Sequence, residues 1–339
     1  MELPILSLDK YKIYQTFCLG LSDTLYFKPE TKSLEGVSFA FYENILRLKS
    51  TMMFPAYLSF YSANTENMMC VSEVEITGKL ERKIGLSGKD DDVYNRFLEF
   101  IKIDDINDRY LLSNDLSKFK DVLLDRVAIG SPSIIAFSHS SSGGAAVEHM
   151  LTSYATSAWT LFETLAGDLW EAALNEHPNC LANLSGRNRF NTESNENVSG
   201  KSKQQEKDEL IKLSMIAGNG WDLRNKMGTI LRRRKSFTTL DGIRIAYSEA
   251  FSKQYKSIDA TLHNSCFDEL STIRNIIVHK GSKADDKYLE CSKRMSSLPK
   301  AQHGEKIFID GGYLSYLISE VINNSLSLLM SIDDWIKSN

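Results

Sequence analysis

The sequence predicts a mainly α-helical protein, in which a C-terminal antiparallel helical bundle follows a smaller N-terminal domain of mixed α/β character. Two observations support this fold class. In the C-terminal half, apolar residues recur every three or four positions over several long stretches, which is the spacing of amphipathic helices. In the first 137 residues, helical patterns at 10–21 and 91–103 are mixed with short runs whose composition favours strands, at 56–61 and 71–77.

Composition also indicates the domain boundaries. The chain has 339 residues, of which 42% are hydrophobic and 25% charged, so it is long enough for two ordinary globular domains. Small polar residues at 138–147 are typical of a linker, which separates an N-terminal domain of unknown role (1–137) from the bundle domain (148–339). Within the bundle domain, residues 185–207 have nothing to bury and predict a mobile loop.

The bundle is expected to begin with a helix at 148–176, whose apolar stripe consists of Leu151, Ala155, Ala158, Phe162, Leu165, Leu169 and Ala172. Shorter helices are predicted at 208–217, 223–234 and 240–251, and a closing helix at 313–337. Before the closing helix, one long amphipathic helix is predicted from Ser257 as its N-cap to Gly281 as its stop. Its core face consists of Ile258, Leu262, Cys266, Leu270, Ile273 and Ile277.

A polar stripe lies on the side of this long helix away from the core. It consists of Asp268, Thr272, Asn275 and His279, at positions i, i+4, i+7 and i+11. Arg274 lies roughly 140° around the helix from His279, at about 100° per residue. Arg274 can therefore share a site with His279 only through its long side chain or through a partner helix. We expect a homodimer, in which two copies of the helix complete the site.

Arg274 and His279 are suited to phosphodiester chemistry. An arginine can hold a phosphate through two parallel hydrogen bonds, and a histidine can move a proton near neutral pH. Together they can cleave a phosphodiester without a metal ion. No metal or other cofactor is expected, because the six histidines show no ligand spacing with cysteines or carboxylates.

The run Arg274-Asn275-Ile276-Ile277-Val278-His279 resembles the Arg-x4-His signature, with Asn after the Arg, of the HEPN superfamily of all-helical endoribonucleases and toxins. The segment 158–171 is similar to the long first helix of abortive-infection-type members, and 332–336 to the end of their last helix. The resemblance covers about residues 149 to 337. It implies a HEPN-like bundle and a metal-independent endoribonuclease that cleaves single-stranded RNA by 2′-hydroxyl attack, as a toxin or antiphage abortive-infection effector.

In this interpretation, His279 activates the 2′-hydroxyl or protonates the leaving oxygen, Arg274 stabilises the phosphorane and Asn275 orients the phosphate. The toxin setting also allows for an antitoxin or another regulatory partner. The alternative is a non-catalytic HEPN-like RNA-binding or scaffold protein, in which Asn275 and His279 form an internal hydrogen-bonded pair. Cleavage of RNA by the purified protein would separate the two.

Three further residues are candidates for a supporting role at the site. Asp268 and Thr272 share the polar stripe with the catalytic candidates. Glu163 lies among apolar residues of the first bundle helix, where it either orients Arg274 or has a solvated or capping role.

RNA contacts require a local basic patch, because the chain as a whole carries a net charge of -4 and has a pI near 5.9. The predicted RNA-binding residues are Lys280, Lys283, Arg232, Arg233 and Arg234. The run of arginines suits backbone phosphates, and it equally suits a solvated helix end next to its own dipole.

The expected location is the cytoplasm. Five scattered cysteines without a CxxC pair indicate reduced thiols. The first residues lack the basic start and apolar run of a signal peptide, and no stretch is long and apolar enough to predict a membrane span.

Overall fold

The computed structural model describes residues 26–77, 141–181, 213–251 and 256–339, together with the single positions 95, 96, 99, 102, 122 and 126. Its described helices are α2 (Lys32–Thr77), α5 (Ser141–Glu176), α6 (Pro178–Leu181), α7 (Leu213–Ala217), α8 (Met227–Arg232), α9 (Leu240–Ala250), α10 (Lys256–Leu262), α11 (Ser265–Lys280), α12 (Asp286–Arg294) and α13 (Gly311–Ser338). The prediction of a mainly α protein is therefore confirmed. Within these ranges the strand pairing is limited to an isolated bridge between Lys283 and Lys306.

The chain divides into two compact units. The first consists of Met1–Thr24, Lys49–Met150 and Asp310–Ser315, and the second of Leu25–Leu48, Leu151–Ile309 and Tyr316–Asn339. The second unit contains every candidate site residue named above. Of the predicted linker, 138–140 lies outside the described residues and 141–147 forms the first turns of α5. The predicted mobile loop at 185–207 also lies outside the described residues.

The mixed α/β character predicted for the N-terminal part was wrong for its described residues. Helix α2 runs without interruption through 56–61 and 71–77, the two runs that favoured strands. The preference of aromatic and β-branched residues for strands depends on their packing, and a helix that has already formed extends at little cost. In the stretch at 91–103, the described positions 95, 96, 99 and 102 are helical, whereas the stretch at 10–21 lies outside the described residues.

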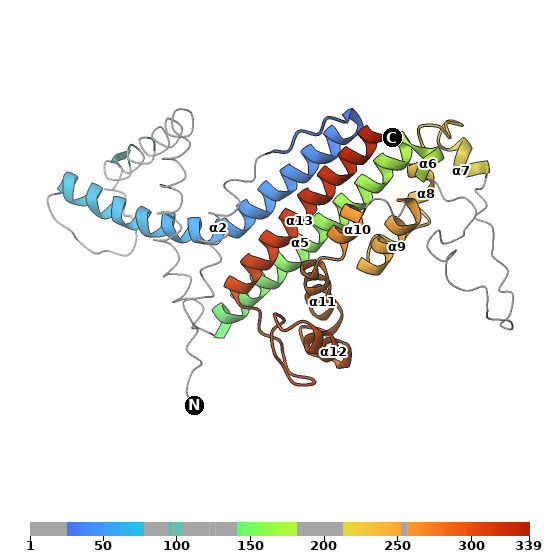
Figure 1. Ribbon diagram of the computed structural model, residues 1–339. Coiled ribbons are helices and arrows are strands. Elements are labelled where there is room, and N and C mark those ends of the chain that lie inside the picture. Colours follow the sequence, from blue (N-terminus) through green and yellow to red (C-terminus); the bar gives the residue numbers. More distant parts are fainter. Residues whose placement is uncertain are drawn as a thin grey trace. The chain divides into compact units, whose positions relative to one another are not determined.

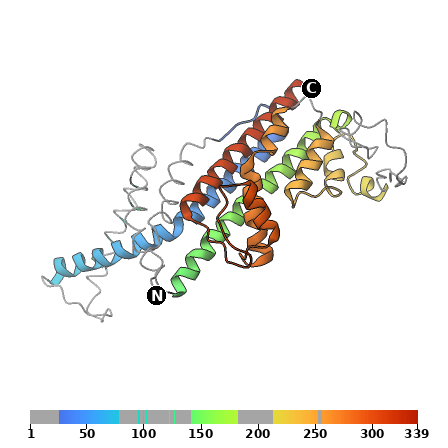
Figure 2. The same cartoon turned by 60° about the horizontal axis from the view of Figure 1, so that its bottom comes forward.

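Three helices form the bundle of the second unit (Figure 1, Figure 2): α2 up to residue 48, α5 from residue 151 and α13 from residue 316. The backbone N–H of Thr31 donates to Asp333 Oδ1 at 2.9 Å, so the start of α2 meets the end of α13 and these helices are antiparallel. The ring of His177 lies 5.3 Å from that of Trp335, so α5 and α13 end together. The expected antiparallel order is therefore wrong for α5 and α13, which run parallel. The short helices between them carry the chain back to the end of the bundle where α5 begins.

Helices α9 and α11 pack on α5 through aromatic side chains. Phe162 of α5 stacks on Phe267 of α11, with ring centroids 4.0 Å apart. The indole N–H of Trp170 donates to the Ala246 carbonyl at 3.0 Å, and the Tyr247 hydroxyl donates to the Ala166 carbonyl at 2.8 Å. Both hydrogen bonds are buried and join α5 to α9. The predicted apolar stripe of α5 is buried as far as Leu169, with Ala172 at its edge.

The long helix predicted from Ser257 to Gly281 is in fact two helices, α10 and α11, separated at residues 263 and 264. Asn264 is the N-cap of α11, where its side chain accepts a hydrogen bond from the Cys266 N–H at 3.0 Å. An asparagine that caps its own following helix competes with continuation of the preceding one, which explains the break. The predicted stop at Gly281 is confirmed, because Gly281 adopts the left-handed conformation with φ 57°.

In the described part of the chain, none of the helices combines the length and the apolar character needed to cross a membrane.

Candidate functional site

The three side chains predicted to be catalytic meet at the C-terminal end of α11. Nη1 of Arg274 donates to Oδ1 of Asn275 at 3.1 Å and lies 3.4 Å from Nε2 of His279. The arginine side chain is long enough to cover the angle of about 140° between positions 274 and 279. One helix of one chain therefore brings Arg274 and His279 together. Of the two predicted routes, the long side chain of Arg274 is the one observed, and no partner helix is needed for this contact. His279 is exposed, and Arg274 and Asn275 are partly buried.

The contact between Arg274 and His279 has a direction. A guanidinium only donates hydrogen bonds, so Nε2 of His279 is the acceptor in this 3.4 Å contact. A phosphate that takes the Arg274 hydrogen bond in place of His279 would leave the lone pair of Nε2 free beside the reacting group.

The packing and capping of α11 fix the position of these side chains. Phe267, Leu270 and Ile273 are fully buried on its core face, and Ile276 rather than the predicted Ile277 completes that face. At its C-terminal end, the Ser282 N–H donates to the Ile276 carbonyl at 3.0 Å. The next residues pair with a later loop, in which the Ile307 N–H donates to the Ser282 carbonyl at 2.7 Å.

A cavity of about 290 Å³ lies between α11 and α12, next to the catalytic candidates. Helix α12 lies beside the C-terminal part of α11 (Figure 1). The cavity is lined by Thr272, Asn275, Ile276, His279, Lys280, Asp285, Lys287, Tyr288 and Cys291. Three of the four polar-stripe residues thus face one cavity. Sequence analysis missed the α12 wall, although Asp285 before an amphipathic stretch is a helix-start signal.

Tyr288 is a fixed part of this wall. Burial raises the pKa of its hydroxyl to about 12, and the hydroxyl donates to the Pro299 carbonyl at 2.5 Å. Tyr288 therefore stays protonated near neutral pH and serves as structure.

Asp268, the fourth member of the polar stripe, has a structural partner. Arg244 of α9 donates to both its carboxylate oxygens, each at 2.9 Å. The same guanidinium donates to the Leu262 carbonyl at the end of α10, at 2.9 and 3.0 Å. Arg244 thus joins α9, α10 and the start of α11. Sequence analysis did not single it out, because an ion pair between separate helices leaves no local pattern.

Glu163 accepts a hydrogen bond from the indole N–H of Trp159 at 2.8 Å. Both residues belong to α5, so this carboxylate is engaged within its own helix. This contact differs from both roles predicted for Glu163, the orientation of Arg274 and a solvated or capping role.

Arg232, in the predicted basic patch, is tied to α5. Its Nη1 lies 2.6 Å from Asp168 Oδ1 and 2.8 Å from Glu171 Oε2. Burial would lower the pKa of Arg232, but the hydrogen bonds to Glu171 and Asp168 outweigh burial and the pKa is raised. Its side chain also lies over the Phe237 ring. Two carboxylates thus balance this cation, whereas Arg233 next to it is exposed.

The two predicted RNA-binding lysines lie near the end of α11. Lys280 lines the cavity, and its Nζ is 3.7 Å from Oδ2 of Asp285. Lys283 is exposed and takes part in the bridge with Lys306. Both lie close in sequence to His279, and Lys280 shares its cavity.

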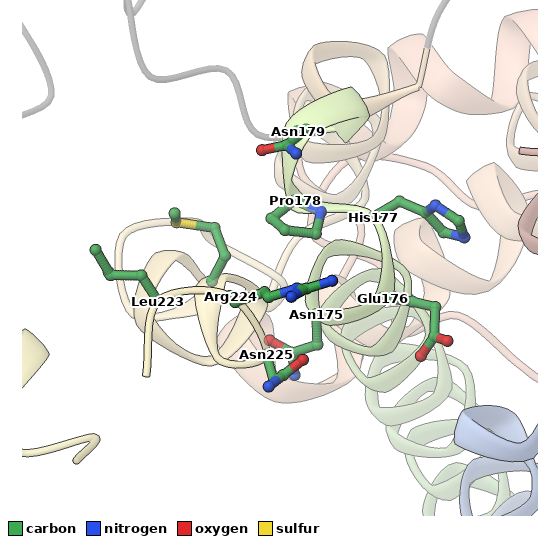
Figure 3. A pocket seen from close by; sticks show the side chains of 9 residues that line it. Asn175, Glu176, His177, Pro178, Asn179, Leu223, Arg224 and Asn225 are labelled. Atoms are coloured by element: carbon green, nitrogen blue, oxygen red, sulfur yellow. The ribbon is translucent and has the colours of Figure 1, made fainter. Parts of the chain in front are cut away.

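A second cavity, of about 650 Å³, lies between the end of α5 and the segment before α8 (Figure 3). Arg224 extends towards the last turn of α5, whereas the ring of His177 points away (Figure 3). The amide of Asn175, at its edge, is held by the backbone and side chain of Thr229. None of the residues predicted for the site lines this cavity.

Among the described residues, no group of three or more His, Cys, Asp or Glu side chains is arranged to hold a metal ion. Comparisons of the chain with protein-family models, curated proteins and solved structures found no match.

Proposed function

We propose that this protein is a metal-independent endoribonuclease that cleaves single-stranded RNA by attack of a 2′-hydroxyl on the adjacent phosphate. The observation that supports the proposal is the contact between the Arg274 guanidinium and Nε2 of His279, next to a cavity open to solvent. A phosphate-binding group and a proton acceptor are thereby close enough to act on the same nucleotide.

In the proposed reaction, Nε2 of His279 takes the proton of the 2′-hydroxyl. The 2′-oxygen then forms a bond to phosphorus, and the bond from phosphorus to the 5′-oxygen breaks. Arg274 stabilises the extra negative charge on the phosphorane, and Asn275 holds Arg274 in place through its Oδ1. A proton passes to the leaving 5′-oxygen, which leaves a 2′,3′-cyclic phosphate on one product and a 5′-hydroxyl on the other.

The proposal includes a homodimer, in which His279 of one subunit takes the proton and the second copy supplies one to the leaving oxygen. A cytoplasmic toxin or antiphage abortive-infection effector is the setting that the HEPN resemblance implies. In that setting, an antitoxin or another regulatory partner would control the activity of the protein.

One observation favours the alternative, a non-catalytic HEPN-like RNA-binding or scaffold protein. Arg274 contacts both Asn275 and His279, so the three side chains satisfy one another without a ligand. In that case the contact is structural, and its loss would change stability instead of cleavage.

Cleavage of labelled single-stranded RNA in excess chelator distinguishes the two functions. His279→Ala and Arg274→Ala should each lower the rate by roughly 10² to 10⁴, as loss of a proton-transfer or charge-stabilising group does. His303→Ala and Arg294→Ala are matched controls, because both residues are exposed and neither lines the cavity. Equal cleavage by all variants would assign the activity to a contaminant, and no cleavage by the wild-type protein would favour the alternative.

A further inference from the structure

The cavity between α11 and α12 is the right size for one part of an RNA chain. Its volume of about 290 Å³ is at the lower end of the range for small-molecule sites, roughly 300 to 1,000 Å³. It therefore suits a single base and its sugar better than a longer segment. Ile276 and Tyr288 form apolar walls, and both are buried. Asn275 and His279 also line it, so a base inside would belong to a nucleotide beside the cleaved phosphate.

Asp285 is an unexpected residue in a cavity next to a phosphate site. Its Oδ1 is fixed as the N-cap of α12, where it accepts from the Tyr288 N–H at 2.9 Å. Its Oδ2 is 3.7 Å from Lys280 Nζ, a distance too long for a hydrogen bond. A carboxylate repels a phosphate, but it accepts hydrogen bonds from the N–H groups of a base. Asp285 is thus a fixed acceptor for a base edge.

Two lining residues, Lys287 and Asn275, supply hydrogen-bond donors beside Asp285. Lys287 adds an ammonium group from α12. The Oδ1 of Asn275 is occupied by Arg274, which leaves the amide N–H₂ to donate into the site. The cavity therefore offers one fixed carboxylate acceptor together with several donors.

We propose, on the basis of the proposed function, that this cavity binds a guanine base of single-stranded RNA, with Asp285 as acceptor and Lys287 as donor. Guanine presents two adjacent N–H groups, N1 and N2. Oδ2 of Asp285 can accept one of them, and the second lone pair of Oδ1, beside its N-cap bond to the Tyr288 N–H, can accept the other. The O6 and N7 atoms of guanine accept from a lysine. Adenine, cytosine and uracil each present a single N–H-bearing group on that edge. Single-stranded RNA is read in this way, through the edges of bases that are not stacked in a helix.

Binding of the four nucleoside 3′-monophosphates, measured by calorimetry, tests the proposal without need of cleavage. Guanosine 3′-monophosphate should bind roughly 5- to 150-fold more tightly than the other three, the discrimination of a good bidentate base contact. Asp285→Asn should bring the dissociation constants of the four nucleotides within about twofold of one another. This variant keeps the helix cap, because Asn caps as well as Asp, but it replaces the free acceptor by a donor.

Asp286→Asn is the matched control, since it removes the same charge from the next, exposed residue, which does not line the cavity. Asp286→Asn should keep the preference for guanosine 3′-monophosphate. Lys287→Gln should lose this preference, as Asp285→Asn does, whereas Lys293→Gln, further along α12, should keep it. An unchanged melting temperature of Asp285→Asn shows that its fold is intact.

The result separates this proposal from the nuclease. Equal binding of the four nucleotides by the wild-type protein, or no binding at millimolar concentration, would overturn the guanine site even if RNA is cut. Selective binding of guanosine 3′-monophosphate that Asp285→Asn abolishes would support the site even if no RNA is cut.

Discussion

The Arg274 guanidinium lies 3.4 Å from Nε2 of His279, although the two residues are five positions apart on one helix. The same nitrogen of Arg274 also bonds Asn275. This geometry depends on the length and the planar fork of arginine. A lysine at this position has a shorter reach and a single charged nitrogen.

Arg274→Lys should therefore lower the rate of RNA cleavage by about 10², close to the effect of Arg274→Ala. The measurement is single-turnover cleavage in excess chelator, with Arg294→Lys as the control at an exposed arginine. A lysine variant with wild-type activity would show that charge alone is needed, and that the paired contact with Asn275 and His279 is not.

Arg244→Ala should destabilise the second unit, because it leaves Asp268 and the Leu262 carbonyl without their partner. Loss of a charged, partly buried hydrogen-bond partner costs about 1–3 kcal/mol in the free energy of unfolding. Urea unfolding measures this change, with Asp259→Ala as a control at an exposed carboxylate. Arg244→Ala and Asp268→Ala should be non-additive when combined. Full additivity would contradict a direct ion pair between them.

Asp333→Asn should lower stability at neutral pH and have less effect in acid. Burial would raise the pKa of Asp333, but hydrogen bonds from Thr31 and Glu30 and the charge of Lys337 outweigh it, and the pKa is lowered from its ordinary 3.8. A lowered pKa stabilises the fold above pH 3.8, and this contribution is lost as the pH falls through the folded value. Urea unfolding at pH 7 and pH 3 should show a difference between variant and wild type that shrinks in acid. A constant difference would contradict the assignment.

Two glycines make a matched pair for testing the packing of α8 on α5. A Cβ on Gly228 would lie 2.1 Å from the Glu171 carbonyl oxygen, whereas one on Gly167 would lie 2.6 Å from the end of the flexible Arg232 side chain. Gly228→Ala should therefore cost about 1–3 kcal/mol despite the helix preference of alanine. Gly167→Ala should cost less, since the end of the Arg232 side chain can shift more easily than a backbone carbonyl, even though it is paired with Asp168 and Glu171. Thermal melting of both variants measures this, and equal effects would argue against the close approach of α8.

Helical periodicity predicted the parts of the fold that depend on local pattern. It identified α5, α13 and most of α11, because a buried face repeats every three or four residues whatever the neighbours are. It failed for α2 at 56–61 and 71–77, where short alternating runs carry too little information to separate a strand from a helix. It also joined α10 to α11, because the cap at Asn264 does not interrupt the apolar pattern.

The candidate site was predictable to a similar extent. The spacing placed Thr272, Asn275 and His279 on one face, and the structure has them in one cavity. The partner of Asp268 and the α12 wall with Asp285 could not be predicted, because they depend on how separate helices pack. Arg274 contacts His279 although their positions are on different sides of the helix, because the arginine side chain is long enough to extend around it.

The most direct test of the central claim compares two RNAs that differ by one oxygen. One is an all-ribose strand with a mapped cut, and the other carries a single 2′-deoxynucleotide on the 5′ side of that cut. In excess chelator, the wild-type protein should cut only the all-ribose strand, and mass spectrometry should find a 2′,3′-cyclic phosphate and a 5′-hydroxyl. Cleavage of both strands at the same position, or products with a 3′-hydroxyl and a 5′-phosphate, would contradict 2′-hydroxyl attack activated by His279.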